Sequence, residues 1–283
     1  MKRRTWLFVP GADPAAHRAA ARSGADVIML DLEDFTPPEL RPKARELSRE
    51  VFDRWREAGA AAAVRINPLE SGGLEDLLGV LAGRPDIILM SKVVSPEQVM
   101  ALDKATGSSV ELVPNVETAA GLMNTFQIAT ASPRVSALLV ASEDMVADLG
   151  TARSRKGEEL AYVRGRFLVE CRAAGVEAID APYTFSDVKG AVADARYGKR
   201  LGYRMKSLVD PSHAKAINRI FSVDRKQLSK ARRIVEAFEK ARRAGRERAK
   251  VDGALIEVPI YAAAKRLIES AGHTPPRRQR KAG

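Results

Sequence analysis

Residues 26–68 read DVIMLDLEDFTPPELRPKARELSREVFDRWREAGAAAAVRINP and contain one complete strand–helix–strand unit. The apolar runs Asp26–Leu32 and Ala61–Pro68 are typical of strands that are buried on both faces. Between them, Pro42–Ala58 is rich in helix-forming residues and begins with a proline, which is favoured in the first turn of a helix. A strand, a helix and a second strand in this order indicate parallel strands joined by a crossover helix.

The same alternation continues in both directions along the chain. Six more strands are predicted at Thr5–Pro10, Asp86–Val93, Ser108–Glu117, Val135–Asp144, Glu177–Tyr183 and Arg204–Asp210. Further helices are predicted at Pro14–Ser23, Pro96–Ala105, Glu159–Ala174 and Asp187–Leu201. Eight apolar strands that alternate with helices predict an α/β fold, a closed (β/α)8 TIM barrel that spans residues 1–222 and carries the catalytic site.

The pattern changes after the eighth strand. A very basic helix with one apolar stripe is predicted at Asp224–Ala244, and a last helix is predicted at Ile260–Ala271 after a polar hinge. We expect residues 223–272 to form a C-terminal helical arm or lid that packs on its own barrel or on a neighbouring subunit. Residues 273–283 are expected to be a disordered basic tail.

The composition excludes several classes of protein. Apolar residues make up 45% of the chain and charged residues 29%, which is typical of a globular protein. The single cysteine, Cys171, rules out an internal disulfide, and only three histidines accompany it as ligands for a zinc site. No apolar stretch approaches the roughly 20 residues of a membrane span. We therefore expect a cytoplasmic protein with no membrane partner.

The net charge of +11 is concentrated near the C-terminus. Residues 223–283 hold 17 Lys and Arg against 7 Asp and Glu, whereas the rest of the chain is nearly balanced. A basic segment of this kind is one mark of a nucleic-acid-binding protein. However, no aromatic side chains interleave with the charges to form a stacking platform. We expect a solvated helix, or a segment that helps to hold an anionic ligand, and no nucleic-acid partner.

Charged side chains gather where the predicted strands end, and this is the end at which barrel enzymes carry their active sites. Glu117 ends the fifth strand and Asp144 ends the sixth, so both carboxylates converge on one volume. Two carboxylates, completed by water and a chelating substrate, suit Mg²⁺ or Mn²⁺. Arg65, near the end of the third strand, either holds a substrate carboxylate through its guanidinium fork or neutralises the acids.

Simpler roles are predicted for other residues at strand ends. Asp34, Asp180 and Asp210 are expected to cap the turns and helices that follow them. Lys92 is expected to form an ion pair with the acidic cluster rather than to act as a Schiff-base nucleophile. Composition and strand order by themselves indicate a metal-assisted barrel enzyme.

Seven groups of short motifs resemble those of the citrate lyase beta-subunit-like and malyl-CoA lyase family, within the HpcH/HpaI aldolase superfamily. The motifs are Arg4–Gly11, Asp31–Asp34 with Lys43–Arg45, Val64–Pro68, Val116–Ala119, Ser142–Met145 with Asp148–Gly150, Ala178–Asp180 with Gly202–Lys206, and Val251–Glu257. No single motif is decisive, but their number and their order along nearly the whole chain make the resemblance strong. Members of this family act on acyl-CoA thioesters.

The resemblance implies roles for individual residues. It implies that Glu117 and Asp144 bind Mg²⁺, with Glu117 also beside the substrate, and that Arg65 grips the carboxylate of a 2-oxo acid or 3-hydroxyacyl-CoA. Glu257 matches an acid that, in the CoA lyases of this family, enters a neighbouring subunit's site as general acid and base. We therefore expect a homo-oligomer, either a trimer or a hexamer. CoA is part of the substrate, and its phosphates are expected to meet Arg4, Lys43 and Arg45.

Four departures from the family's pattern bear on the substrate more than on the metal site. Glu257 stands where Asp is usual, and its extra methylene moves the charge by roughly 1.5 Å. Ala120 stands where the family often has Arg. The pair Ala141-Ser142 replaces a common Gly-Ala pair, and Val209-Asp210-Pro211 stands where Ile-His-Pro is usual.

The predicted function is a Mg²⁺-dependent carbon–carbon lyase. It would cleave or form a 3-hydroxyacyl-CoA, such as malyl-CoA, citramalyl-CoA or citryl-CoA, by retro-Claisen chemistry. The first alternative is a CoA-independent, metal-dependent aldolase of 4-hydroxy-2-oxo acids that uses the same site. The second is a non-catalytic protein that binds nucleic acid or a protein partner through its basic segment.

Overall fold

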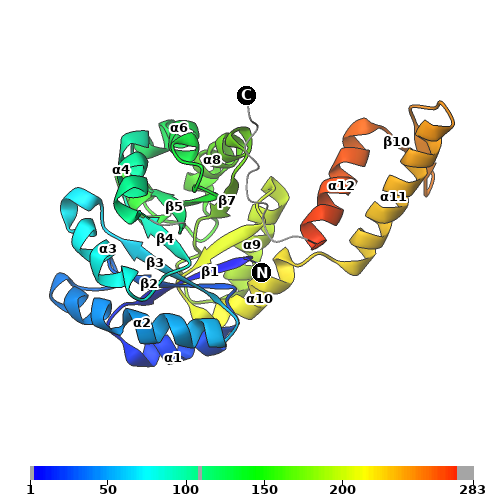
Figure 1. Cartoon of the computed structure of the whole chain (residues 1–283). Helices are drawn as coiled ribbons and strands as arrows, with labels where there is room; N and C mark the ends of the chain where they lie inside the picture. Colours follow the sequence, from blue (N-terminus) through cyan, green and yellow to red (C-terminus); the bar gives the residue numbers. More distant parts are fainter. Residues whose placement is uncertain (1–2, 108–109, 273–283) are drawn as a thin grey trace. The chain divides into compact units, whose positions relative to one another are not determined.

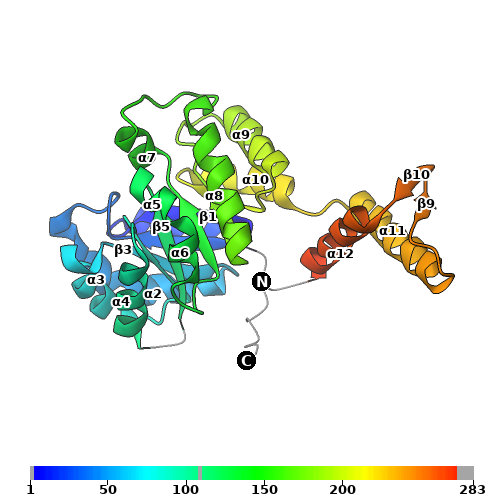
Figure 2. The same cartoon turned by 90° about the horizontal axis from the view of Figure 1, so that it is seen from above.

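The computed structural model describes residues 3–107 and 110–272. The tail predicted to be disordered, residues 273–283, lies outside the described residues. The contacts divide the chain into two compact units, one comprising Arg3–Phe221 and the other beginning at Ser222. Figures 1 and 2 show the elements of both units.

Eight parallel strands form a closed barrel in the first unit. They pair in sequence order, and β1 closes the ring by pairing with β8. The strands are β1 Thr5–Pro10, β2 Val27–Asp31, β3 Ala61–Ile66, β4 Ile87–Met90, β5 Glu111–Val116, β6 Ala137–Val140, β7 Glu177–Asp180 and β8 Met205–Leu208. The predicted (β/α)8 barrel is confirmed, and every strand lies within its predicted range.

Helices connect the strands and surround the barrel (Figure 1). They are α1 Pro14–Ser23, α2 Arg41–Glu57, α3 Gly73–Leu81, α4 Pro96–Thr106, α5 Ala119–Met123, α6 Thr125–Thr130, α7 Glu143–Asp148, α8 Ala161–Ala174, α9 Val188–Leu201 and α10 Ala214–Phe221. Short 3₁₀ turns occur at Pro38–Leu40, Leu69–Ser71, Glu158–Leu160 and Pro211–His213. Local chemistry sets the ends of α1: the Asp13 side chain accepts hydrogen bonds from the first free amides, and Gly24 ends the helix with φ 78°.

Inward-facing side chains fill the barrel in layers, each contributed by four alternate strands. From the amino end, the strand registers give the layers Val27, Ile87, Ala137, Met205; then Trp6, Ala63, Val113, Ile179; then Met29, Leu89, Leu139, Ser207. These layers are apolar apart from Ser207, so this part of the barrel is a packed core. The next layer contains Phe8, Arg65 and Asn115, and polar side chains begin there.

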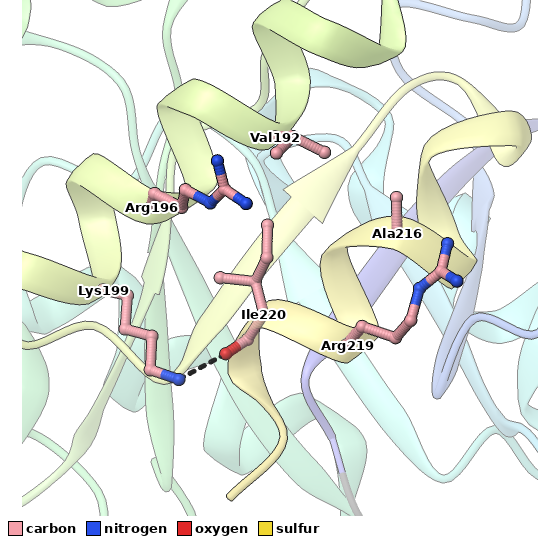
Figure 3. Close-up of a pocket in the computed structure, with 6 residues that line it drawn as sticks. All are labelled: Val192, Arg196, Lys199, Ala216, Arg219 and Ile220. Carbon is pink, nitrogen blue, oxygen red and sulfur yellow. Dashed lines mark hydrogen bonds between the residues drawn. The ribbon is translucent and has the colours of Figure 1, made fainter. Parts of the chain in front are cut away.

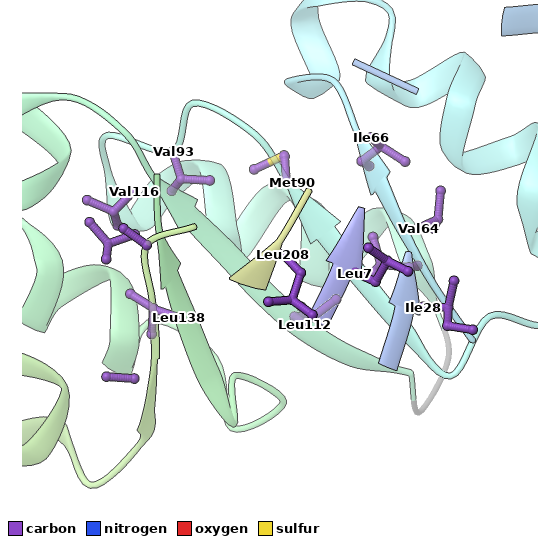
Figure 4. Packing of buried hydrophobic residues seen from close by; sticks show 14 of the residues in the cluster. Leu7, Ile28, Val64, Ile66, Met90, Val93, Leu112, Val116, Leu138 and Leu208 are labelled. Carbon is purple, nitrogen blue, oxygen red and sulfur yellow. The ribbon is translucent and has the colours of Figure 1, made fainter. Parts of the chain in front are cut away.

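Outward-facing side chains of the same strands form the second part of the core, between the barrel and its helices. Figure 4 shows this packing. Members of this cluster include Leu7, Ile28, Val64, Met90, Leu112, Val116, Leu138 and Leu208. Burial on both faces explains why the strands are continuously apolar in sequence.

The second unit is a helical hairpin with a small sheet. It contains α11 Arg225–Arg243, the antiparallel strands β9 Ala249–Val251 and β10 Ala254–Ile256, and α12 Val258–Gly272. Phe238 of α11 stacks on Tyr261 of α12 with ring centroids 4.6 Å apart. Residues of the apolar stripe of α11 therefore pack within their own unit. The contact of the arm with its own barrel or with a neighbouring subunit stays a prediction.

The sheet of the second unit was missed by the sequence reading, although a signal for it is present. Asp252 and Gly253 join the two short strands with φ values of 52° and 77°. Two central residues with positive φ form the turn that fits the twist of a two-residue β-hairpin, and Asp-Gly is a preferred pair for it.

Candidate active site

The carboxyl ends of β2 and β3 hold an arginine inside a group of three acids. Arg65 donates from Nε to Asp31 Oδ1 at 2.8 Å and from Nη2 to Asp31 Oδ2 at 2.5 Å. Its Nη1 lies 3.0 Å from Glu33 Oε2, and its Nη2 lies 3.2 Å from Asp34 Oδ2. Burial alone would lower the pKa of Arg65, but the adjacent carboxylates raise it well above its usual value. The guanidinium is therefore a fixed positive charge, and it lies over the Phe8 ring at 4.7 Å.

Lys92 links this group to the end of β5. Its Nζ lies 2.6 Å from Glu33 Oε1, and its backbone N–H donates to Glu117 Oε1. Lys92 has φ 53°, a left-handed conformation that is uncommon outside glycine. The hydrogen bond from Lys92 to Glu33 raises the pKa of the lysine, so it remains charged. The predicted ion pair of Lys92 with the acidic cluster is confirmed.

Glu117 is fully buried at the end of β5. Its Oε1 accepts a hydrogen bond from the backbone N–H of Lys92, whereas its Oε2 has no hydrogen-bond partner among the described residues. Burial raises the pKa of Glu117 to about 8; the positive charge of Arg65 opposes this, and the negative charge of Asp144 adds to it. The structure thus brings Glu117, Asp144 and Arg65 together. Glu117 directly follows β5, as predicted, but Asp144 does not end a strand: β6 ends at Val140, and Asp144 lies in the first turn of α7.

The residues present fit a divalent cation. The carboxylates of Asp31, Glu33, Asp34, Glu117 and Asp144 are gathered near the cations of Arg65 and Lys92, so that among these seven described residues acids outnumber cations. The unpartnered oxygen of Glu117 is an available hard ligand. Within the described ranges no three His, Cys, Asp or Glu side chains form a metal-binding group. The chain would therefore supply the two carboxylates of Glu117 and Asp144, and water or substrate oxygens would supply the rest.

Comparison with known proteins identifies the family. The model of the HpcH/HpaI aldolase/citrate lyase family matches residues 4–211. The chain belongs to this family. The resemblance read from the motifs is confirmed, and the matched segment contains Arg65, Glu117 and Asp144 but ends before Glu257.

Relatives of this family member match nearly the full chain. Citrate lyase subunit beta of Haemophilus influenzae is 33% identical over 281 residues, which cover 95% of this chain and 97% of that protein. A (3S)-malyl-CoA thioesterase of Cereibacter sphaeroides is 30% identical over 277 residues, which cover 95% of this chain and 94% of that protein.

A solved structure extends the comparison to ligands. The Mycobacterium tuberculosis protein CitE, solved in complex with magnesium, acetoacetate and coenzyme A, is 27% identical to this family member. It matches with a TM-score of 0.77 over 96% of this chain and 99% of that chain. Family membership and these relatives make this protein citrate lyase beta-like.

The three residues predicted to hold CoA phosphates lie in different places. Lys43 is in the first turn of α2, exposed, and 3.2 Å from Glu46. Arg45 is engaged by Glu75 at 2.5 Å and Asp76 at 2.9 Å. Arg4 precedes β1 and pairs with Asp26 at 2.8 Å, at the amino ends of the strands. The structure therefore does not bring Arg4 to the carboxylate site.

Glu257 lies in the second unit, between β10 and α12. Its carboxylate is half exposed and lies 3.2 Å from Arg248 Nε. The side chain is therefore available to solvent within its own unit, and its catalytic role remains a prediction.

Two of the three predicted caps are wrong. Asp34 contacts Arg65, and Asp180 is fully buried and bonded to Arg164 at 2.6 Å and 2.8 Å. Both carboxylates are used by long-range ion pairs, which local sequence does not reveal. Asp210 is a cap as predicted: its side chain accepts a hydrogen bond from the Ser212 amide at 2.8 Å.

The sequence reading missed a set of buried polar groups near the site. Ser91, Asn115 and Ser142 are at most 1% exposed, and their side-chain polar atoms have no partner among the described residues. One signal was present: Asn115 interrupts the apolar run of β5 two residues before Glu117, on the face that alternation turns inward.

An open cavity on the outside of the barrel belongs to a different region (Figure 3). It has a volume of about 530 Å³ and is lined by α9 and α10, with Arg196, Lys199 and Arg219 at its rim. Lys199 and Arg219 lie in the last turns of their helices, and Lys199 donates to the carbonyl of Ile220. Cations at helix ends complement the helix dipole, so a structural role accounts for them. Within residues 3–107 and 110–272, no helix has both the length and the hydropathy needed to cross a membrane.

Proposed function

We propose that this protein is a Mg²⁺-dependent lyase that cleaves or forms the carbon–carbon bond of a 3-hydroxyacyl-CoA such as malyl-CoA, citramalyl-CoA or citryl-CoA. The observation that carries the proposal is Glu117, a buried carboxylate with one unpartnered oxygen, beside Asp144 in a site with more carboxylates than cations. The names of its relatives, a citrate lyase subunit and a malyl-CoA thioesterase, support a CoA ester as the substrate. So do the magnesium and coenzyme A in the structure of CitE.

The chemistry divides into two proton transfers and one bond cleavage. The substrate hydroxyl loses its proton as the adjacent carbon–carbon bond breaks, which yields an oxo acid and the enolate of acetyl-CoA. The enolate then takes a proton to give acetyl-CoA. Mg²⁺ bound by Glu117 and Asp144 would supply a Lewis acid that lowers the pKa of the hydroxyl.

Individual side chains have defined tasks in this proposal. Arg65 orients the carboxylate of the oxo-acid fragment, and Asp31 fixes the guanidinium for that task. Lys92 holds Oε1 of Glu117, so that Oε2 remains free. Glu257 of a neighbouring subunit serves as the acid and base for the proton transfers. Lys43, exposed in the first turn of α2, meets the phosphates of CoA.

Thioester hydrolysis is the second candidate, because the malyl-CoA thioesterase relatives are about as similar to this chain as the citrate lyase subunits. The two reactions use the same substrate and differ in the bond that breaks. A lyase gives acetyl-CoA and glyoxylate from malyl-CoA, whereas a thioesterase gives malate and free CoA.

Product analysis separates these functions. Purified full-length protein with Mg²⁺ is incubated with malyl-CoA, citramalyl-CoA, citryl-CoA and a 4-hydroxy-2-oxo acid, with Glu117→Gln protein as the control. We expect acetyl-CoA from at least one thioester, and little from the variant. Free CoA without acetyl-CoA would assign a thioesterase. Pyruvate released from the 4-hydroxy-2-oxo acid, with no thioester turnover, would assign a CoA-independent aldolase.

A further inference from the structure

Asn115 is a buried amide without a partner inside the barrel. It lies on β5 two residues before Glu117, its side chain is 0% exposed, and neither Nδ2 nor Oδ1 bonds to a described residue. Because side chains alternate along a strand, Asn115 faces the interior with Val113, a member of the interior cluster. At least nine in ten buried polar groups in proteins have a partner, so an amide with none at either atom points to a missing ligand.

The strand registers place Asn115 at the boundary between the core and the charged site. It shares a layer with Arg65 and Phe8, and the fourth position of that layer falls on Ala181, directly after β7. The layer beneath contains the apolar side chains of Met29, Leu89 and Leu139 together with Ser207. Arg65 and Asn115 come from strands separated only by β4, so both side chains reach the same part of the interior.

Ser91 is a second unpartnered group beside Asn115. The pairing of Met90 with Pro114 places Ser91, the residue after β4, next to Asn115. Its hydroxyl is 0% exposed and has no partner among the described residues. Neither side chain carries a charge. Together they add uncharged hydrogen-bonding groups beside Arg65, at the boundary between the apolar core and the charged site.

We propose that Asn115, with Ser91, forms the inner end of the substrate pocket and selects an oxo-acid fragment that carries an oxygen-bearing group next to its oxo carbon. This inference rests on the proposed function. The amide of Asn115 offers N–H donors and a carbonyl acceptor, and a hydroxyl or carboxylate oxygen of the substrate can accept from the donors. A hydrogen or a methyl group at that position would leave the buried amide unpaired, which is how a hydrogen-bonding site rejects an apolar analogue.

Pyruvate and hydroxypyruvate test this selection, because they differ by a single hydroxyl. Calorimetry measures the binding of each to the full-length protein with Mn²⁺, and condensation with acetyl-CoA gives kcat/KM for each. We expect the protein to favour hydroxypyruvate by roughly tenfold or more. Asn115→Leu removes this preference and leaves the affinity for Mn²⁺ unchanged. The same change raises the melting temperature of the free protein, because an apolar side chain of similar size replaces two unpartnered polar atoms above an apolar layer.

Asn124 provides a matched control. Its amide donates to the carbonyl of Val94 at 2.8 Å, so Asn124→Leu removes a satisfied hydrogen bond. We expect this variant to melt at a lower temperature and to keep the preference for hydroxypyruvate.

The outcomes separate this inference from the proposed function. Equal affinity for the two acids, or a preference that survives Asn115→Leu, overturns the role of Asn115 while the lyase proposal stands. A lower melting temperature of Asn115→Leu would show that the amide has a structural partner, which also overturns it. If the protein binds neither acid, the selection inferred for Asn115 fails, whereas the lyase proposal is decided separately by product analysis with the thioesters. If Asn115→Leu does not fold, Asn115→Ala is tested in its place, and it should likewise lose the preference for hydroxypyruvate over pyruvate.

Discussion

Glu117 occupies a position in which a negative charge is costly. It is fully buried and close to Asp144, and only one of its oxygens accepts a hydrogen bond from a described residue. Burial disfavours the charged form of a carboxylate, and a second carboxylate nearby disfavours it further. A cation between the two acids removes both penalties. The same features that raise the pKa of Glu117 therefore make it a strong candidate ligand for Mg²⁺.

The first prediction concerns this cation. Glu117→Ala and Asp144→Ala should each weaken Mn²⁺ binding by roughly 100-fold or more, since even outer-shell partners of metal ligands contribute tenfold to 100-fold. Glu143→Gln is the matched control, because Glu143 is a neighbouring acid that is exposed and bonds to Arg153 and Thr184. Calorimetric titration with Mn²⁺ measures all three. Affinity equal to that of the parent in Glu117→Ala would remove Glu117 from the site.

Replacement of Arg65 distinguishes a role in binding the substrate carboxylate from a role that only neutralises the nearby acids. Arg65→Lys keeps the positive charge but loses the fork that binds Asp31 through two nitrogen atoms. We expect kcat/KM to fall on the order of 100-fold, because misplacement of a reacting group by about 1 Å has this effect. Arg164→Lys is the control, since Arg164 makes the same two-pronged contact with Asp180 in a different part of the barrel. If kcat/KM is unchanged in Arg65→Lys, the arginine is a structural counter-ion.

At the scale of elements, a buried ion-pair network joins β7 and β8 to α8 and α9. Lys206 of β8 is fully buried and lies 3.0 Å from Asp180 and 2.5 Å from Asp194. Arg164 of α8 contacts the same two acids, so two cations balance two carboxylates. Gly198 of α9 permits this approach, because a Cβ at that position would lie 2.3 Å from Asp180 Oδ2. The network adds charged contacts to the apolar packing that also holds these two helices against the barrel.

Removal of one cation from this network should destabilise the barrel strongly. Lys206→Met keeps much of the side-chain volume but leaves a buried carboxylate without its partner, which costs about 3–5 kcal/mol of unfolding free energy. Lys189→Met, at an exposed position of α9, should change the stability by less than about 0.5 kcal/mol. Guanidinium denaturation measures both. Equal stability of the two variants would contradict the role of the network.

The same network predicts a loss of stability in acid. Burial alone would raise the pKa of Asp194, but Lys206 and Arg164 outweigh it and lower the pKa to about 2. Because this is below the unfolded value of about 3.9, the contribution is present above pH 4 and is lost as the pH falls toward 2. We expect the free energy of unfolding to fall by about 2 kcal/mol less in Asp194→Asn than in the parent over that pH range. Denaturation curves between pH 6 and pH 2 measure the difference, and parallel curves would contradict it.

At the scale of the whole molecule, the barrel unit has nearly balanced charges, whereas the C-terminal unit is strongly basic. The barrel unit carries the carboxylate site, and the second unit has its own core, built around Phe238, Tyr261 and Ile256. The second unit presents Glu257 with its side chain half exposed. The family resemblance implies that this position enters the active site of a neighbouring subunit, so we predict that activity depends on assembly.

Co-expression of two inactive variants tests this assignment. In mixed oligomers of Glu257→Gln and Glu117→Ala, some sites receive an intact copy of each residue, so activity should return to a fraction of the parent's. Each variant expressed alone is the control and should be inactive. Parent-like activity of Glu257→Gln alone would remove its catalytic role. Absence of complementation in confirmed mixed oligomers would place Glu257 over the barrel of its own chain.

Much of the fold follows from the sequence, because its determinants are local or periodic. Strands buried on both faces are predominantly apolar, which identifies all eight strands of the barrel from β1 to β8. Pro14 and Gly24 mark the ends of α1 through backbone chemistry alone. The grouping of Glu117 and Asp144 also follows, since the carboxyl ends of parallel strands in a barrel must converge.

The partners of individual side chains were decided only by the tertiary structure. Asp180 looks like a cap in sequence, yet it is buried against Arg164 and Lys206; Asn115 looks like an interruption, yet it enters the barrel interior without a partner. Both outcomes depend on the face of the strand and on the stagger between strands when the barrel closes. The strand face and the stagger determine which residues that are far apart in the chain come into contact. The sequence thus determined which groups stand at the end of the barrel, and closure of the barrel determined which of them meet.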